Sequence, residues 1–130
     1  VASVLGSVPK LKRIAKYSVL SLGIKLSPEE LRQRIEIRLR QRWRAGLVEE
    51  VKNLHAGGLS WRRLDDLGLE YRWVAHYLQG QLTERETLEK LETEIWHYAK
   101  RQLTWFRRGK KINWITNERQ AEKLCRDFIN

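Results

Sequence analysis

The sequence predicts a mainly helical fold of about five helices and one or two short strands. Two capping boxes, in which a Ser or Thr is followed three positions later by Glu, mark helix starts at Ser27 and Thr83. After each box the apolar residues recur every three or four positions, as they do on the buried face of a helix. Only two stretches show the composition and flanking residues that are typical of strands. Helices therefore account for most of the expected structure.

The expected elements can be placed in order along the chain. They are a strand over 17–24, helices over 28–45, 47–54, 71–78 and 84–108, a strand over 112–115 and a helix over 118–129. Pro28 suits the first turn of its helix because an N–H there has no helical partner, and Gly57 and Gly80 suit helix ends. The buried seam of the longest helix is expected to consist of Leu88, Leu91, Ile95, Tyr98 or Ala99, and Phe106. Two isolated strands do not make a stable sheet, so we expect the strand over 17–24 to belong to a larger one.

Composition and charge limit the possible functions. The 130 residues, 42% of them hydrophobic, fit one domain with a real core. Lys and Arg number 26 against 16 Asp and Glu, and the net charge of +10 favours partners such as nucleic acid or an anionic membrane surface. No apolar run is long enough to span a membrane, and no signal peptide is visible. With one cysteine, Cys125, the sequence predicts a cytoplasmic protein without a disulfide framework.

The chain is expected to comprise three segments. Residues 1–16 form a basic, flexible segment, residues 17–116 form the main part, and residues 117–130 form the last helix. The cations of the first segment are Lys10, Lys12, Arg13 and Lys16. Because the sequence contains no methionine, position 1 included, we expect it to be part of a longer protein.

A search for catalytic and metal-binding motifs gives none. The glycines form no G-x-x-x-x-G-K-[ST] phosphate loop, and there is no H-E-x-x-H pair. His55, His76 and His97 lie on different expected elements, and a lone histidine is more often a satisfied or surface residue than a ligand. We therefore expect no metal site and no catalytic residue in this chain.

The strongest functional signal is the basic run over 100–111, which holds six cations and no acidic residue. Arg101, Trp105 and Arg108 fall on one helix face, where the cations can neutralise phosphates and an exposed Trp can stack on a base. The alternative is a solvated basic helix end, favoured by the helix dipole, with Trp105 and Phe106 in the core. Six cations beside two aromatic residues favour RNA.

A second basic feature lies on the first long helix. Arg34, Arg38 and Arg42 recur every four residues, and such a row of like charges would be relieved by a bound anion or an acidic partner. The alternative is partial pairing with Glu29, Glu30 and Glu36, which leaves no site. Spacing alone favours this second interpretation.

Five motifs occur in a defined order. They are R-I-x-x-R at 34–38, G-L-x-E-E-V at 46–51, Y-L-x-G at 77–80, Y-A-K-R-Q-x-T-W-F-R at 98–107, and Trp114 after a short strand. In this order they resemble the C-terminal half of the tRNA dimethylallyltransferases, the isopentenyl-transferase (IPP transferase) family. The resemblance covers roughly residues 17–115, and the K-R-Q-x-T-W-F-R run is highly specific.

The resemblance implies that this chain is the C-terminal part of a three-layer P-loop α/β transferase. That family transfers a dimethylallyl group from dimethylallyl diphosphate to N6 of adenosine 37, beside the anticodon of tRNA. An Asp acts as the base, and a phosphate loop with Mg²⁺ holds the diphosphate. Because these parts precede the strand over 17–24 in the family, we expect the chain alone to bind no cofactor and to be unable to catalyse the transfer.

Site residues follow from the resemblance by motif position. Arg38, with Arg34, would lie near the diphosphate. The anticodon stem-loop of tRNA would be contacted by Lys100, Arg101, Gln102, Leu103, Thr104, Trp105, Phe106 and Arg107, and by Leu67, Gly68, Leu69, Glu70, Tyr71 and Arg72.

Two positions depart from the family's pattern. Glu70 precedes Tyr71 where the family has Gly, and Gly68 stands earlier, which puts a close backbone approach to RNA in doubt. Ile95 and Trp96 replace a Thr-Arg pair, so any phosphate contact of that Arg is lost. The alternatives to a part of the enzyme are a free-standing, non-catalytic helical RNA-binding module and a basic helical domain without an RNA role. We expect the protein to be monomeric and to have no membrane partner.

Overall fold

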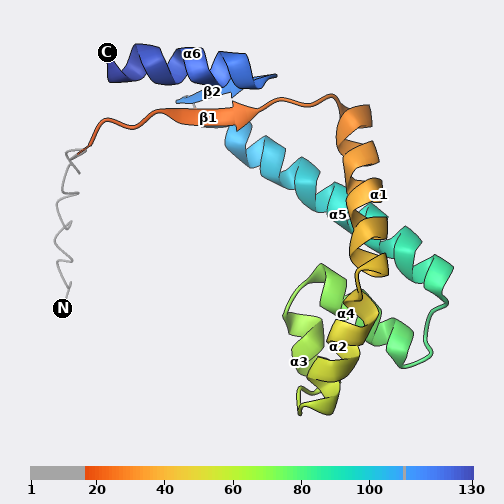
Figure 1. Cartoon of the computed structure of the whole chain (residues 1–130). Helices are drawn as coiled ribbons and strands as arrows, with labels where there is room; N and C mark the ends of the chain where they lie inside the picture. The colour runs from red at the N-terminus through yellow and green to blue at the C-terminus, as the bar shows by residue number, and fades with distance from the viewer. Residues whose placement is uncertain (1–16, 110) are drawn as a thin grey trace, which may run out of the picture.

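The computed structural model describes residues 17–109 and 111–130, which contain six helices and two short strands (Figure 1). In chain order these are β1 (Ser21–Ile24), α1 (Pro28–Arg44), α2 (Leu47–Ala56), α3 (Trp61–Asp66), α4 (Leu69–Leu78), α5 (Glu84–Arg107), β2 (Ile112–Ile115) and α6 (Glu118–Ile129). The mainly helical fold class predicted from the sequence is confirmed. The predicted basic segment over 1–16 lies outside the described residues.

Both predicted capping boxes are formed. The Ser27 Oγ accepts a hydrogen bond from the Glu30 N–H at 3.2 Å, and the Ser27 N–H donates to the Glu30 carboxylate at 3.0 Å. Thr83 and Glu86 make the same reciprocal pair at the start of α5, at 3.3 and 2.7 Å. These local bonds satisfy N–H groups that a helix start leaves without partners, which is why the sequence located both helices closely.

Some predicted boundaries were wrong. Helix α3 was not predicted, because a helix of six residues is too short to show a hydrophobic period. Its start is fixed by Ser60, whose side chain accepts from the Arg63 N–H at 3.2 Å. Helix α4 begins at Leu69 rather than at residue 71, and strand β1 begins at Ser21 rather than at residue 17.

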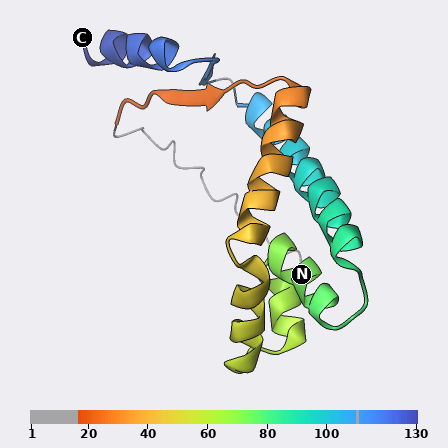
Figure 2. The same ribbon diagram turned by 45° about the vertical axis from the view of Figure 1, so that its right-hand side comes forward.

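The helices form two regions that α1 and α5 connect (Figures 1 and 2). Helices α2, α3 and α4 cluster at one end, and their core consists of Leu47, Val51, Leu64, Val74 and Ala75. Helix α5 packs against both α1 and α4, and its last turns reach the other end, where β1, β2 and α6 lie. Its two ends therefore have very different surroundings.

The two predicted strands pair with each other. Strands β1 and β2 run parallel, with Ser21 opposite Ile112 and Ile24 opposite Ile115, and the intervening helices form the crossover between them. Gly23 lies opposite Trp114, where a Cβ would come within 2.8 Å of the indole ring. The close approach of the Trp114 indole to the backbone of β1 therefore requires glycine at position 23. Within the described residues the sheet has these two strands, so the larger sheet that we expected stays a prediction.

The predicted seam of α5 is right only in part. Leu91 is fully buried and Leu88, Ile95 and Ala99 are half-buried, but Phe106 is 42% exposed. Helix α5 runs beyond the helical cluster, and the small sheet covers only one side of its last turns. Tyr98 and Trp105 are exposed as well, so the interpretation of Trp105 and Phe106 as core residues is wrong.

We predict that Leu64→Ala destabilises the fold by about 2–5 kcal/mol, because Leu64 is fully buried in the helical core and its truncation leaves a cavity. Urea unfolding followed by circular dichroism measures the effect. The control is Leu67→Ala three residues later, which removes the same atoms from a side chain that is 44% exposed. Equal destabilisation by both variants would contradict the placement of α3.

Candidate nucleic-acid interface

The predicted basic face of α5 forms a shallow hollow. Six residues line it, and we call it the basic hollow: His97, Lys100, Arg101, Thr104, Trp105 and Arg108. Its volume is about 470 Å³, and no acidic residue takes part. Trp105 is 68% exposed and makes an edge-to-face contact with Phe106, their ring centroids 5.1 Å apart. The hollow therefore combines exposed cations with an indole, the combination that favours binding to a single-stranded nucleic acid.

Trp105 also lines a second hollow, which is larger than the basic hollow and lies on the side of α5 that faces the sheet. This apolar groove of about 910 Å³ lies between the sheet and the last turns of α5, and Leu22, Ile24, Leu31, Leu103, Phe106 and Ile112 are among its lining residues. Gln102 lines the groove too. The predicted tRNA-contacting run is thus divided between two surfaces: Lys100, Arg101 and Thr104 line the basic hollow, whereas Gln102, Leu103 and Phe106 line the apolar groove.

Trp96 holds two cations near the basic hollow. The Arg32 guanidinium of α1 lies 5.0 Å from the centroid of the Trp96 ring, and the Lys100 ammonium lies 5.8 Å from it. Such cation–π contacts stabilise by about 0.5–1 kcal/mol at exposed sites. Trp96 stands where the resemblance expects Arg, so this position now orients neighbouring cations in place of carrying its own charge.

The second predicted stretch, residues 67–72, comprises the link between α3 and α4 and the first turn of α4. Together with Arg42 and Tyr98 its residues line a hollow of about 430 Å³, which we call the Tyr98 hollow: Leu67, Gly68, Leu69, Glu70 and Tyr71. Gly68 has a φ of 142°, which favours glycine, and a Cβ built there would meet no atom within 4 Å. The backbone is therefore open at Gly68. Arg72 lies apart from this hollow, where it bonds Asp65.

An ion-pair network fixes this turn. Arg42 of α1 contacts Glu50 of α2 and Glu70 of α4, each at 3.2 Å, and the Tyr71 hydroxyl donates a hydrogen bond to Glu50. The bond from Tyr71, together with the charge of Arg42, lowers the pKa of Glu50, and the same bond raises the pKa of Tyr71. The bond to Glu70 raises the pKa of Arg42. Three helices are thus tied together beside the turn.

The arginines of α1 are partly neutralised, both within the row of Arg34, Arg38 and Arg42 and beside it. Arg42 pairs as described, and Arg40 pairs with Glu36 at 3.0 Å. Hydrogen bonds from Ser27 lower the pKa of Glu30, and the charge of Arg34 adds to the effect. Arg38 is exposed and makes no ion pair or hydrogen bond with another described residue, and the same holds for Arg34, so both guanidiniums are available to an anion.

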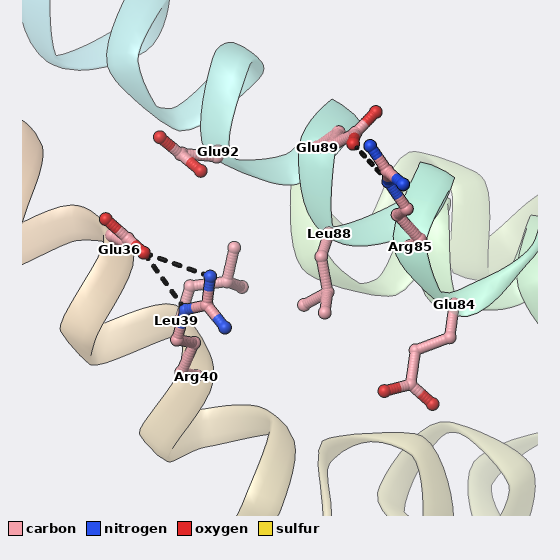
Figure 3. Close-up of a pocket in the computed structure, with 8 residues that line it drawn as sticks. All are labelled: Glu36, Leu39, Arg40, Glu84, Arg85, Leu88, Glu89 and Glu92. Carbon is pink, nitrogen blue, oxygen red and sulfur yellow. Dashed lines mark hydrogen bonds and ion pairs between the residues drawn. The ribbon is translucent and has the colours of Figure 1, made fainter.

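A separate hollow between α1 and the start of α5 is acidic (Figure 3). Four carboxylates and two guanidiniums line it with two leucines: Glu36, Glu84, Glu89, Glu92, Arg40, Arg85, Leu39 and Leu88. Both guanidiniums are engaged, because Arg40 pairs with Glu36 and Arg85 pairs with Glu89 at 2.9 Å. The carboxylates of Glu84 and Glu92 add negative charge that these two pairs do not balance. We call this hollow the acidic cleft, and its charge makes it unsuited to RNA.

The histidines and carboxylates of the described residues form no metal centre. No group of three or more His, Cys, Asp or Glu there could hold a metal ion. His55 stacks on Trp61 and is bonded to the Leu59 carbonyl, and His76 is bonded to Asp65. None of the described helices is long and apolar enough to cross a bilayer.

Three residues that line the basic hollow or the Tyr98 hollow were not predicted from the sequence as site residues. The sequence pattern places Arg42 in a row of like charges and assigns either Tyr98 or Ala99 to the buried seam of the long helix. His97 was dismissed as a lone histidine, although it lies four residues before Arg101 on the same helix face. Extending the basic face by one turn towards the start of the helix would have found His97. Tyr98 and residues 67–71 are far apart in the sequence and line one hollow only through tertiary packing, which leaves no local signal.

Comparison with known proteins identifies consistent relatives. A family model described as IPP transferase matches residues 4–109. The chain is 48% identical over 103 residues to tRNA dimethylallyltransferase 1 of Syntrophus aciditrophicus, an alignment that covers 76% of this chain and 34% of that protein. It is 51% identical over 100 residues to tRNA dimethylallyltransferase of Treponema pallidum, an alignment that covers 73% of this chain and 32% of that protein. The chain spans about a third of the length of these curated relatives.

Solved structures with a similar fold are transferases of the same kind as these relatives. The full-length tRNA isopentenylpyrophosphate transferase from Bacillus halodurans superposes with a TM-score of 0.76 at 27% identity, covering 90% of this chain and 40% of that one. The tRNA delta(2)-isopentenylpyrophosphate transferase from Staphylococcus epidermidis gives a TM-score of 0.69 at 31% identity, covering 77% and 32%. The arrangement of the described elements is therefore shared with solved proteins.

We predict that Tyr71→Phe raises the pKa of Glu50 towards its ordinary value, because the largest cause of its lowering is the bond from the Tyr71 hydroxyl. A carboxyl with a lowered pKa in the folded state stabilises above its unfolded pKa, and this stability is lost as the pH falls through the folded pKa. The variant should therefore be less stable than the wild type by about 1 kcal/mol at pH 7 and equally stable in acid.

Urea unfolding at several pH values, with carboxyl NMR titration of Glu50, measures both effects. Tyr98→Phe is the matched control, since the Tyr98 hydroxyl makes no hydrogen bond to any other described residue. A stability difference for Tyr71→Phe that persists unchanged at pH 3 would contradict the role of the Glu50 charge.

Proposed function

The chain belongs to the IPP transferase family, because the family model matches most of its length, and we propose that it takes part in tRNA dimethylallylation. In this reaction the dimethylallyl group of dimethylallyl diphosphate is transferred to N6 of an adenosine beside the anticodon of tRNA. The names of relatives at 48% and 51% identity support this proposal. These relatives are about three times as long as this chain. We therefore propose that the chain contributes to the reaction and does not carry it out alone.

The proposed share is RNA binding. The observation that carries it is the exposure of Trp105 among cations in the basic hollow, with no acidic residue beside it. Phosphate contacts by Lys100, Arg101 and Arg108 would supply affinity and position, and the indole would stack on a base. An enzyme that acts on a base must unstack it, and an aromatic platform close to phosphate-binding cations suits that task.

A second proposed contribution concerns the diphosphate. When the bond between the allylic carbon and the diphosphate breaks, negative charge develops on the leaving group, and fixed cations lower the barrier. Arg38 fits this role because it makes no ion pair within the described residues, and Arg34 precedes it by one turn on the same helix face. The described residues hold no group of three ligands for the Mg²⁺ that the family resemblance implies, and we assign no step to it. A cytoplasmic location accords with tRNA as the substrate.

We predict that the chain binds an anticodon stem-loop RNA with an affinity that falls steeply with salt. Arg101→Ala should weaken binding and reduce the slope of log K against log salt concentration by about one, because one phosphate contact is lost. Trp105→Ala should weaken binding about tenfold while leaving the slope unchanged, because stacking carries no charge. Fluorescence anisotropy at several salt concentrations measures both.

The controls are exposed residues of the same types on α6: Arg119→Ala and Phe128→Ala. Neither should change affinity or slope. Absence of binding by a folded wild-type chain, or salt-independent binding, would overturn the proposed RNA-binding role.

We predict that Arg38→Gln weakens binding of inorganic diphosphate about tenfold, since a hydrogen bond to a charged group is worth about 1.5–3 kcal/mol. Isothermal titration calorimetry in low salt measures the affinity. Arg40→Gln is the matched control, because Arg40 on the same helix is already paired with Glu36. A wild-type chain that binds no diphosphate, or equal losses for the two variants, would refute the assignment of Arg38.

A further inference from the structure

The Tyr98 hollow lies where the two stretches with proposed RNA contacts meet. Residues 67–71 form one wall, and Tyr98 is contributed by α5, about one turn before Arg101 of the basic hollow. An RNA strand that follows the cations of α5 therefore passes the mouth of this hollow. Its volume of about 430 Å³ accommodates a nucleobase.

Tyr98 has the properties of a stacking platform. Tyr98 lies on α5 and is 50% exposed. Its hydroxyl makes no hydrogen bond to another described residue. The Arg101 guanidinium lies 5.9 Å from the ring centroid. This cation lies over the ring and restrains it, so little side-chain entropy remains to be lost when a base packs against the exposed part of the ring.

The polar groups of the hollow are held in place before any ligand arrives. Glu70 accepts from Arg42 through Oε2, which leaves Oε1 available to a donor, and Arg42 is fixed by its second pair with Glu50. The open backbone at Gly68 lets a flat ligand approach closely. A carboxylate oxygen beside an aromatic ring matches a base that carries an exocyclic amino group, because that group is a hydrogen-bond donor.

We propose that the Tyr98 hollow receives one unstacked RNA base that carries an exocyclic amino group. The base stacks on Tyr98 and donates its amino hydrogen to Glu70. The inference rests on the proposed RNA-binding function and deepens it, because it names the part of the RNA that this hollow takes. Tyr98 and Glu70 are thereby binding residues in addition to those of the basic hollow.

Fluorescence of 2-aminopurine, placed at each loop position of the anticodon stem-loop in turn, tests the stacking. One position should be quenched by the wild-type chain and by Tyr98→Phe, which keeps the ring. Tyr98→Ala should abolish that quenching and weaken binding about tenfold. Phe128→Ala, an exposed aromatic residue of α6, should leave both unchanged. Glu70→Gln should reduce the preference for cytosine over uracil at the quenched position.

A direct measurement needs no variant. RNA carrying 5-iodocytidine at the quenched position should photo-crosslink to the wild-type chain at Tyr98, as mapped by mass spectrometry. Crosslinking confined to Trp105, or full quenching and affinity in folded Tyr98→Ala, would overturn this inference while RNA binding itself stands. A wild-type chain that binds no RNA would instead refute the proposed function on which it rests.

Discussion

The position of α5 is the constraint on which the rest of the structure depends. The helix has 24 residues, so it is about 36 Å long, and it connects the helical cluster at one end with the sheet at the other. Near its start Leu91 is fully buried between neighbouring helices, whereas Trp105 near its end is largely exposed. One helix is therefore part of the core over its first turns and offers side chains to a partner over its last turns.

Arg42 determines where the turn into α4 lies relative to this helix. Individual ion pairs at half-exposed sites stabilise by about 1 kcal/mol or less, so the network is a minor source of stability. Its effect is geometric, because Arg42 bonds carboxylates of two helices at once and Tyr71 bonds one of those carboxylates. Glu70 departs from the family's pattern in the sequence, and its orientation in the structure follows from this network.

The sequence predicted those parts of the fold whose causes are local. The capping boxes at Ser27 and Thr83 and the apolar period after them located α1 and α5 closely, because side chain and backbone interact within a few residues. Helix α3 is too short to show a period. The exposure of Phe106 and the position of Tyr98 in one hollow with residues 67–71 depend on tertiary packing, which the spacing of residues along one helix does not determine.

The charges of α5 have a structural cause that is independent of RNA. Acidic side chains gather in its first turns, at the acidic cleft, and basic ones in its last turns, which is the distribution that the helix dipole favours. The basic end alone is therefore weak support for a ligand. The dipole does not account for aromatic rings among those cations, because exposing an indole to water costs free energy that burial would recover. The exposure of Trp105 and Tyr98 beside Lys100 and Arg101 is consequently the observation that supports the proposed RNA-binding role over an ordinary basic helix end.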